Sequence, residues 1–160
     1  MLKLGIRVSS SSSSGRGHFE RCLAIRKKIS QKVSWFVDNE SDYVKNKIFT
    51  LDELFIENGK NKYSCLKKSI KNNYINCVLL DNYYISSDDI YKINNKTPTV
   101  VFVDKNTNAR AHMLICPQPI EFKPSKRIKY LIGPKYAPIS ENFIFKNNKN
   151  IKNKNILISF

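Results

Sequence analysis

The chain has 160 residues, 41% of them hydrophobic, and its 28 lysines and arginines against 13 acidic residues give a formal net charge of +15. A chain of this length buries about two thirds of its surface on folding, so we expect a hydrophobic core and one main domain. No apolar run approaches the roughly 18 residues of a membrane-spanning helix, and the first residues are too weakly apolar for a signal peptide. Clustered positive charge would favour a nucleic-acid partner, but these lysines are scattered among asparagines and isoleucines, which is typical of a solvated surface.

The four cysteines, Cys22, Cys65, Cys77 and Cys116, form no C-x-x-C pair. Most of them lie within apolar runs, where a thiol packs as a small hydrophobic group. We therefore expect a reduced, cytoplasmic protein without a metal site.

Short apolar runs alternate with helical patterns, and this alternation predicts βαβ units around a parallel sheet, an α/β fold. We expect a first strand at 2–9 and, after a serine-rich and glycine-rich stretch, a helix at 18–30. A strand at 32–38 follows, and 48–55 fits either a strand or a helix. The later expected elements are a helix at 60–72, a strand at 77–81, a helix with Ser86 as its N-cap, and strands at 99–104, 112–117 and 130–138.

The last part of the sequence changes in character. Residues 147–155 (NNKNIKNKN) are polar and charged without apolar periodicity, which predicts a linker. Residues 156–160 (ILISF) have the composition of a buried strand. We therefore expect one domain over residues 1–146 and a further α/β domain of which 156–160 is the first strand.

The stretch RVSSSSSSGRGHFERC, residues 7–22, joins the first expected strand to the first expected helix. Ligands of open parallel sheets bind beyond the carboxyl ends of the strands, and this loop commonly holds an anion. Gly15 and Gly17 would let the backbone approach a ligand closely. The loop matches neither the Walker A pattern nor the dinucleotide pattern, and a serine run is also typical of a flexible segment.

Four side chains are candidates for chemistry at that edge of the sheet. His18 would lie at the helix start, where the helix dipole favours a neutral imidazole that can accept a proton, although it can also merely cap the helix. Arg21 can neutralise substrate charge or pair on the surface. Asp81 and Asp104 each end an apolar strand, where a carboxylate can bind sugar hydroxyls, orient a base or cap a turn. His112 is expected to be structural.

These residues occur in an order that resembles the hydrolases of pseudaminic acid biosynthesis, which remove UDP from UDP-2,4-diacetamido-2,4,6-trideoxy-β-L-altropyranose. That family opens with R-x-D-x-S, a few residues, and G-x-G-H-x-x-R-C-L. The matching residues here are Arg7, Ser9, Gly15, Gly17, His18, Arg21, Cys22 and Leu23. Later segments, LLDNYYIS, VVFVD and YLIGPKYAPISENF, resemble further family motifs in the same order. The chain departs from the family pattern at Ser9, Lys105 and Ser140, where the family has Asp, Asp and Arg.

The resemblance implies the Rossmann-like N-terminal domain of a two-domain GT-B fold, similar to the MurG-like glycosyltransferases. A C-terminal UDP-binding domain would follow in the same chain or be a separate one. The implied activity is metal-independent hydrolysis without a cofactor, with His18 as the general base for water and Arg21 near the departing phosphate. The substrate-binding residues that it implies are Gly15, Arg16, Gly17, Arg21, Asp81, Tyr83, Asp104 and Tyr136.

The expected partner is thus a UDP-sugar, and neither nucleic acid nor a membrane. Three other interpretations stay open. The first is a non-catalytic domain that binds a sugar nucleotide or a protein partner, the second is a basic nucleic-acid binder, and the third is another GT-B-like enzyme. UDP release separates the first from a hydrolase, and an affinity insensitive to salt would argue against the second.

Overall fold

A computed structural model describes the chain except for residues 11–15, 58–62, 83–84, 106, 124 and 140–160. Its strands are β1 (Leu4–Val8), β2 (Val33–Val37), β3 (Glu53–Ile56), β4 (Cys77–Asp81), β5 (Thr99–Phe102), β6 (Met113–Cys116) and β7 (Lys129–Ile132). Its helices are α1 (Gly17–Arg26), α2 (Asp42–Lys47), α3 (Ser64–Lys71) and α4 (Ser87–Asn94), and a short 3-10 turn covers Pro134–Tyr136.

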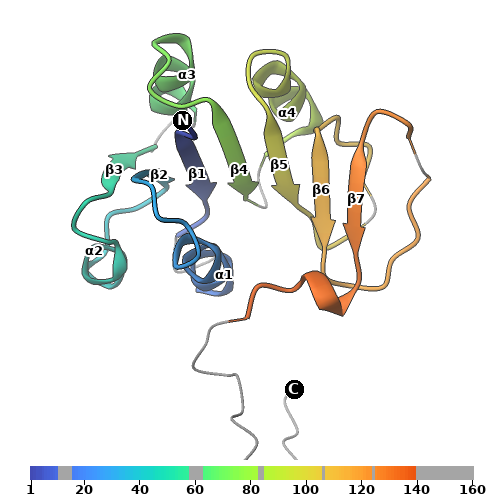
Figure 1. Cartoon of the computed structure of the whole chain (residues 1–160), viewed down its shortest axis with the longest axis horizontal. Coiled ribbons are helices and arrows are strands. Elements are labelled where there is room, and N and C mark those ends of the chain that lie inside the picture. Colours follow the sequence, from blue (N-terminus) through green and yellow to red (C-terminus); the bar gives the residue numbers. More distant parts are fainter. Residues whose placement is uncertain (11–15, 58–62, 83–84, 106, 124, 140–160) are drawn as a thin grey trace, which may run out of the picture.

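The strands form one seven-stranded sheet in the order β3-β2-β1-β4-β5-β6-β7 (Figure 1). Every pairing in it is parallel. The chain moves outward from β1 to β3 and then returns to the other side of β1 with β4, so the strand order reverses between β1 and β4. This is the Rossmann-like arrangement, in which ligands bind near that switch point. The predicted α/β, Rossmann-like class is confirmed.

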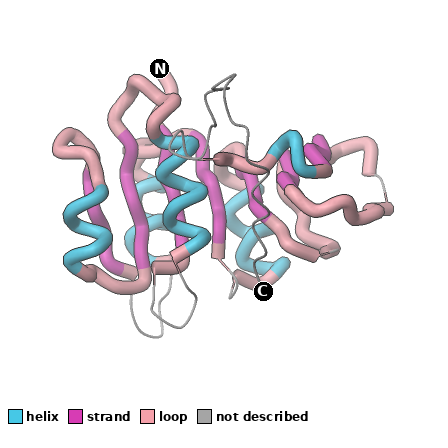
Figure 2. Tube along the Cα trace, turned by 90° about the horizontal axis from the view of Figure 1, so that it is seen from below, coloured by secondary structure: helices cyan, strands magenta, loops and turns pink. Residues whose placement is uncertain are grey.

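Helices cover both faces of the sheet (Figures 1 and 2). α1 and α2 share one core cluster with alternate residues of the strands, and α3 and α4 share a second cluster on the other face. All five residues of β1 and all five of β2 are buried, as expected for parallel strands covered on two sides. Gly5 fits this crowding, because a Cβ there would lie 2.7 Å from the Cδ1 of Ile75.

Most predicted elements lie close to the observed ones. The strand predicted at 77–81 coincides with β4, and the Ser86 side chain caps α4 by accepting a hydrogen bond from the Asp89 N–H. The ambiguous segment 48–55 ends inside β3, so its last three residues are in a strand. α2 was not predicted, although its N-cap, Ser41, accepts a hydrogen bond from the Val44 N–H as a serine cap does.

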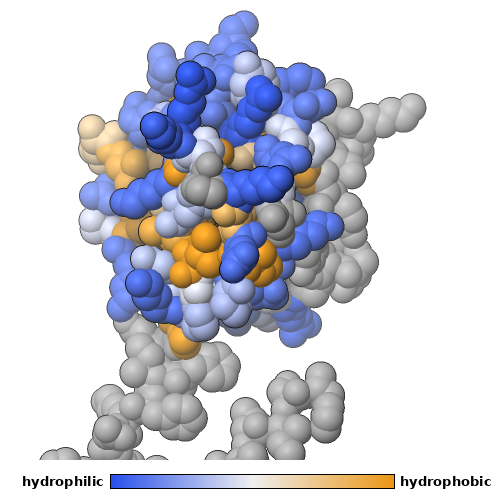
Figure 3. All heavy atoms as spheres, turned by 90° about the vertical axis from the view of Figure 1, so that its right-hand side faces the viewer, coloured by the Kyte–Doolittle hydropathy of each residue, from blue (hydrophilic) through white to orange (hydrophobic). Residues whose placement is uncertain are grey.

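The side of the molecule near β7 is built differently from the β3 side. In the part of the chain that the structure describes, the connections from β5 to β6 and from β6 to β7 contain no helix. Figure 3 shows apolar side chains gathered on this side within a hydrophilic surround. The predicted linker at 147–155 and the predicted strand at 156–160 lie outside the described residues, and the domain prediction stays untested.

Candidate active site

Three elements bring four of the predicted residues together at the carboxyl edge of the sheet. His18 is in the first turn of α1, and Arg21 follows one helical turn later. Asp81 is the last residue of β4, and Asp104 follows the neighbouring strand β5. Because residues three apart share a helix face, His18 and Arg21 both reach Asp81.

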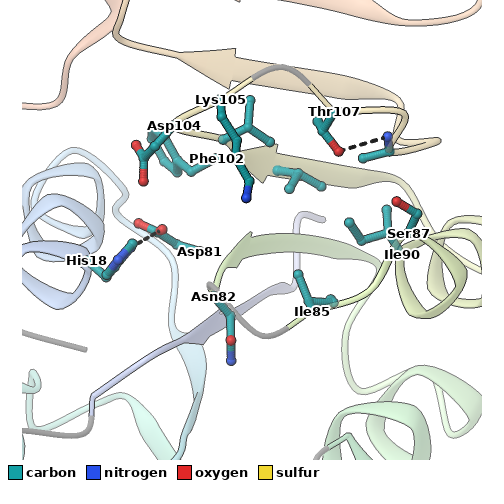
Figure 4. Close-up of a pocket in the computed structure, with 13 residues that line it drawn as sticks. His18, Asp81, Asn82, Ile85, Ser87, Ile90, Phe102, Asp104, Lys105 and Thr107 are labelled. Atoms are coloured by element: carbon teal, nitrogen blue, oxygen red, sulfur yellow. Dashed lines mark hydrogen bonds and ion pairs between the residues drawn. The ribbon is translucent and has the colours of Figure 1, made fainter. Parts of the chain in front are cut away.

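His18 and Asp81 form a buried pair. The His18 Nδ1 lies 2.5 Å from the Asp81 Oδ1, and the two residues are 5% and 1% exposed (Figure 4). Nδ1 also lies 3.0 Å from the Arg21 Nη2, which can only donate, but the shorter contact to the ionised Asp81 favours the tautomer in which Nδ1 carries the proton and donates it to the carboxylate. This tautomer leaves Nε2 as the proton-accepting nitrogen of the ring. The geometry is that of an imidazole oriented by a carboxylate, which can serve as a general base.

Arg21 joins both acids. Its Nε and Nη2 donate to the two carboxylate oxygens of Asp81, the Nη2 contact being 2.5 Å, and its Nη1 donates to the Asp104 Oδ1 at 3.1 Å. The guanidinium also lies over the Phe102 ring, 4.6 Å from its centroid. Arg21 therefore does not form a simple surface ion pair. It links α1 to the ends of β4 and β5, and we call this set of contacts the Arg21 clamp.

The charges of this cluster stabilise one another. Burial alone would raise the pKa of Asp81, but hydrogen bonds from Arg21 and His18, together with the Arg21 charge, hold it below its ordinary value of 3.8. Burial opposes the charge of Arg21 as well, yet its bonds to Asp81 raise the Arg21 pKa. Asp81 is therefore ionised at neutral pH, as an orienting carboxylate must be.

A second buried carboxylate, Asp52, supports the fold away from this edge. It accepts hydrogen bonds from Arg26 Nε at 2.6 Å, from the Trp35 indole at 2.9 Å and from the Val33 N–H at 3.1 Å. Burial would raise its pKa, but the Arg26, Trp35 and Val33 hydrogen bonds lower it below 3.8.

Stability is expected to fall in acid because of these two carboxyls. A group whose pKa is lower in the folded chain than in the unfolded chain contributes stability above its unfolded pKa, and loses it as the pH falls through the folded value. The pKa values of Asp52 and Asp81 are both lowered. Urea unfolding measured from pH 7 downward should therefore show a free energy of unfolding that declines once the pH drops below about 4. An unchanged free energy down to about pH 2 would contradict the assignment.

A cavity of about 230 Å³ opens beside the His18 and Asp81 pair, beyond the carboxyl ends of β4 and β5 (Figure 4). One part of its wall is apolar and consists of Ile85, Ile90, Val101, Phe102, Val103 and Ala109. The polar part adds Asn82, Ser87, Asp104, Lys105 and Thr107 to the pair. The mixed wall suits a small organic ligand, or part of one, with both apolar and polar groups.

Three other predicted site residues that the structure describes, Arg16, Gly17 and Tyr136, do not line this cavity. Gly17 is the exposed first residue of α1, and Arg16 precedes it with its guanidinium 4.2 Å from the centroid of the Tyr43 ring. Tyr136 lines a separate groove against the second half of α1. Gly15 and Tyr83 are outside the described residues.

The sequence interpretation missed several residues that line the cavity. Asn82 and Lys105 directly follow the two predicted acids, so their position after a strand end was a usable signal. Ser87 and Thr107 carry no local signal, because a helix start and a loop reach the cavity only through the tertiary fold.

No group of three histidine, cysteine or acidic side chains that could hold a metal ion occurs among the residues the structure describes. Within the same residues, no helix is long and apolar enough to cross a membrane.

All four cysteines are free thiols. Burial raises the pKa of the Cys22 thiol well above its usual value, and the nearby Asp81 charge raises it further, so Cys22 stays protonated beside the site.

Fold and site together define a Rossmann-like α/β protein with a carboxylate-oriented histidine beside a cavity at the carboxyl edge of its sheet. Comparison of the chain with models of known protein families and with curated proteins gives no match.

Proposed function

We propose that this chain is the sugar-binding part of a hydrolase that removes UDP from UDP-2,4-diacetamido-2,4,6-trideoxy-β-L-altropyranose. The observation that carries the proposal is the buried His18 and Asp81 pair beside the cavity. The order of sequence motifs from Arg7 to Phe143 adds the resemblance to hydrolases of pseudaminic acid biosynthesis. A UDP-binding C-terminal domain, in the same chain or in a separate one, completes the proposed GT-B-like enzyme.

In the proposed reaction, His18 Nε2 takes a proton from a water molecule as the water oxygen attacks the anomeric carbon. The new bond forms between that carbon and the water oxygen, and the bond to the UDP oxygen breaks with its electron pair on UDP. Asp81 stabilises the positive charge that appears on the imidazole. The transition state carries positive charge on the sugar and growing negative charge on the phosphate.

The cavity wall supports a sugar of this kind. A deoxysugar with acetamido groups carries methyl groups beside hydroxyl and amide groups, and the wall offers apolar side chains such as Ile85 and Val101 beside polar ones such as Asp104. Burying the methyl groups against the apolar wall contributes binding energy, while the polar groups set the orientation. We place the protein in the cytoplasm, because its free cysteines suit a reducing compartment.

The proposal is tested by measuring UDP release with the polypeptide expressed from its own gene. We expect release from this substrate with a chelator present, and at least tenfold slower release from UDP-N-acetylglucosamine, which lacks the second acetamido group. Binding of the substrate without UDP release would instead favour the non-catalytic binding domain.

Gly17→Ala should separate folding from ligand approach. A Cβ at Gly17 meets nothing within 4 Å, and the residue is exposed at the first position of α1. The free energy of unfolding should therefore stay constant or rise by up to about 1 kcal/mol. If the α1 amides approach the phosphate, the added methyl group should slow UDP release about tenfold or more. Unchanged release in a stable variant would remove Gly17 from the site.

A further inference from the structure

Lys105 differs from the other cation of the site in having no acidic partner. The Arg21 charge is shared between Asp81 and Asp104. Lys105 lines the same cavity and is exposed, and in the described part of the chain no carboxylate lies within ion-pair distance of its Nζ. In Figure 4 its ammonium group points into the cavity, between Asp81 and Thr107.

Two side chains with hydroxyl groups, Thr107 and Ser87, line the same cavity as Lys105. The Thr107 Oγ1 accepts a hydrogen bond from the Ala109 N–H at 3.2 Å, which leaves its hydroxyl proton for another acceptor. Ser87 begins α4, so both its hydroxyl and the positive end of that helix dipole border the cavity. Asp88 and Asp89 share the first turn of α4, but neither lines the cavity, and Asp89 accepts a hydrogen bond from the Ser86 hydroxyl.

We infer that Lys105, with Thr107 and Ser87, forms a subsite for an anionic group of the ligand, a phosphate or diphosphate. The inference rests on the proposed function in one respect: that function identifies the anionic group as the diphosphate of the UDP leaving group. Negative charge grows on the leaving phosphate as the bond to the sugar breaks, and an ammonium group without a carboxylate partner stabilises it more than a guanidinium already held by two acids. Arg21 accordingly acts as a positioning residue for His18 and Asp81, while Lys105 contacts the phosphate.

Binding of inorganic pyrophosphate tests the subsite without any reaction. Calorimetric titrations at one fixed ionic strength compare the unchanged polypeptide with Lys105→Met and Lys105→Arg. The matched control is Lys129→Met, because Lys129 is also exposed but starts β7, at the opposite edge of the sheet. We expect Lys105→Met to weaken pyrophosphate binding about tenfold or more, and Lys105→Arg to keep it within about threefold. Lys129→Met should bind as the unchanged protein does.

Three results would overturn the subsite: no saturable binding to the unchanged protein, equal affinity in Lys105→Met, or an equal loss in Lys129→Met. The last result would mean that pyrophosphate responds only to the overall charge of +15. A Lys105-dependent affinity in a protein that releases no UDP from any UDP-sugar would support the subsite and contradict the proposed hydrolase.

Discussion

Asp81→Asn is expected to lower the free energy of unfolding by about 3 kcal/mol and to reduce UDP release at least a hundredfold. Asp81 is 1% exposed and accepts hydrogen bonds from His18, Arg21 and the Cys22 thiol. An asparagine keeps the shape but presents an NH₂ group where these donors need an acceptor. It also removes the closest negative charge from Arg21, whose side chain is only 18% exposed.

Urea unfolding at pH 7 measures the first effect, and the UDP assay measures the second. The matched control is Asp104→Asn, since that carboxylate bonds the same guanidinium but is 30% exposed and makes one contact at 3.1 Å. We expect this control to lose less than about 1 kcal/mol. Equal losses in the two variants would mean that Asp81 is only one of two equivalent acids and does not organise the site.

His18→Asn is expected to lower UDP release by about two to four orders of magnitude, because it removes the general base. The asparagine NH₂ group can occupy the place of Nδ1 and donate to Asp81, so the fold should lose no more than about 1.5 kcal/mol. The expected pattern is a folded protein that retains substrate binding and has lost turnover. Turnover within about threefold of the unchanged protein would contradict the assignment of His18 as the base.

His112 supplies the control for this experiment, since it is the other of the two histidines in the chain. It is exposed, and its Nδ1 accepts a hydrogen bond from the Thr99 N–H at 3.2 Å, at the start of β5 and away from the cavity. We expect His112→Asn to release UDP at the unchanged rate. A similar loss in both variants would indicate a general effect on folding.

Local patterns explain why the fold class was predictable. Parallel strands buried on both faces are nearly continuous apolar runs, and CVLLD and TVVF stand out for that reason. α2 was missed because its six residues are too few to show a helical period. α1 ends at Arg26 and not near residue 30, because the N–H groups of Lys28 and Ile29 bond to carbonyls only three residues back, those of Ile25 and Arg26, and the chain leaves the α-helix there. The apolar spacing continues through this turn and does not mark it.

The candidate site was predictable residue by residue but not as a geometry. His18, Asp81 and Asp104 could be chosen because each lies where a strand ends or a helix begins. The clamp formed by Arg21 depends on β4 and β5 lying side by side, and strand order is set by packing over the whole sheet. The place of Lys105 directly after Asp104 marked it as a residue of the same sheet edge, but which cavity it lines depends on the same strand order.

The Arg21 clamp also bears on how such a chain would change if its chemistry were no longer needed. Arg21 and Asp81 fasten α1 to the sheet, so selection for folding alone would retain them. The presence of Arg21 and Asp81 is therefore evidence for the fold and not for catalysis, and a descendant that had lost turnover would still keep both residues. After such a loss, we expect His18 and Lys105 to be substituted first. An asparagine can replace His18 in its hydrogen bond to Asp81, and Lys105 has no acidic partner among the described residues.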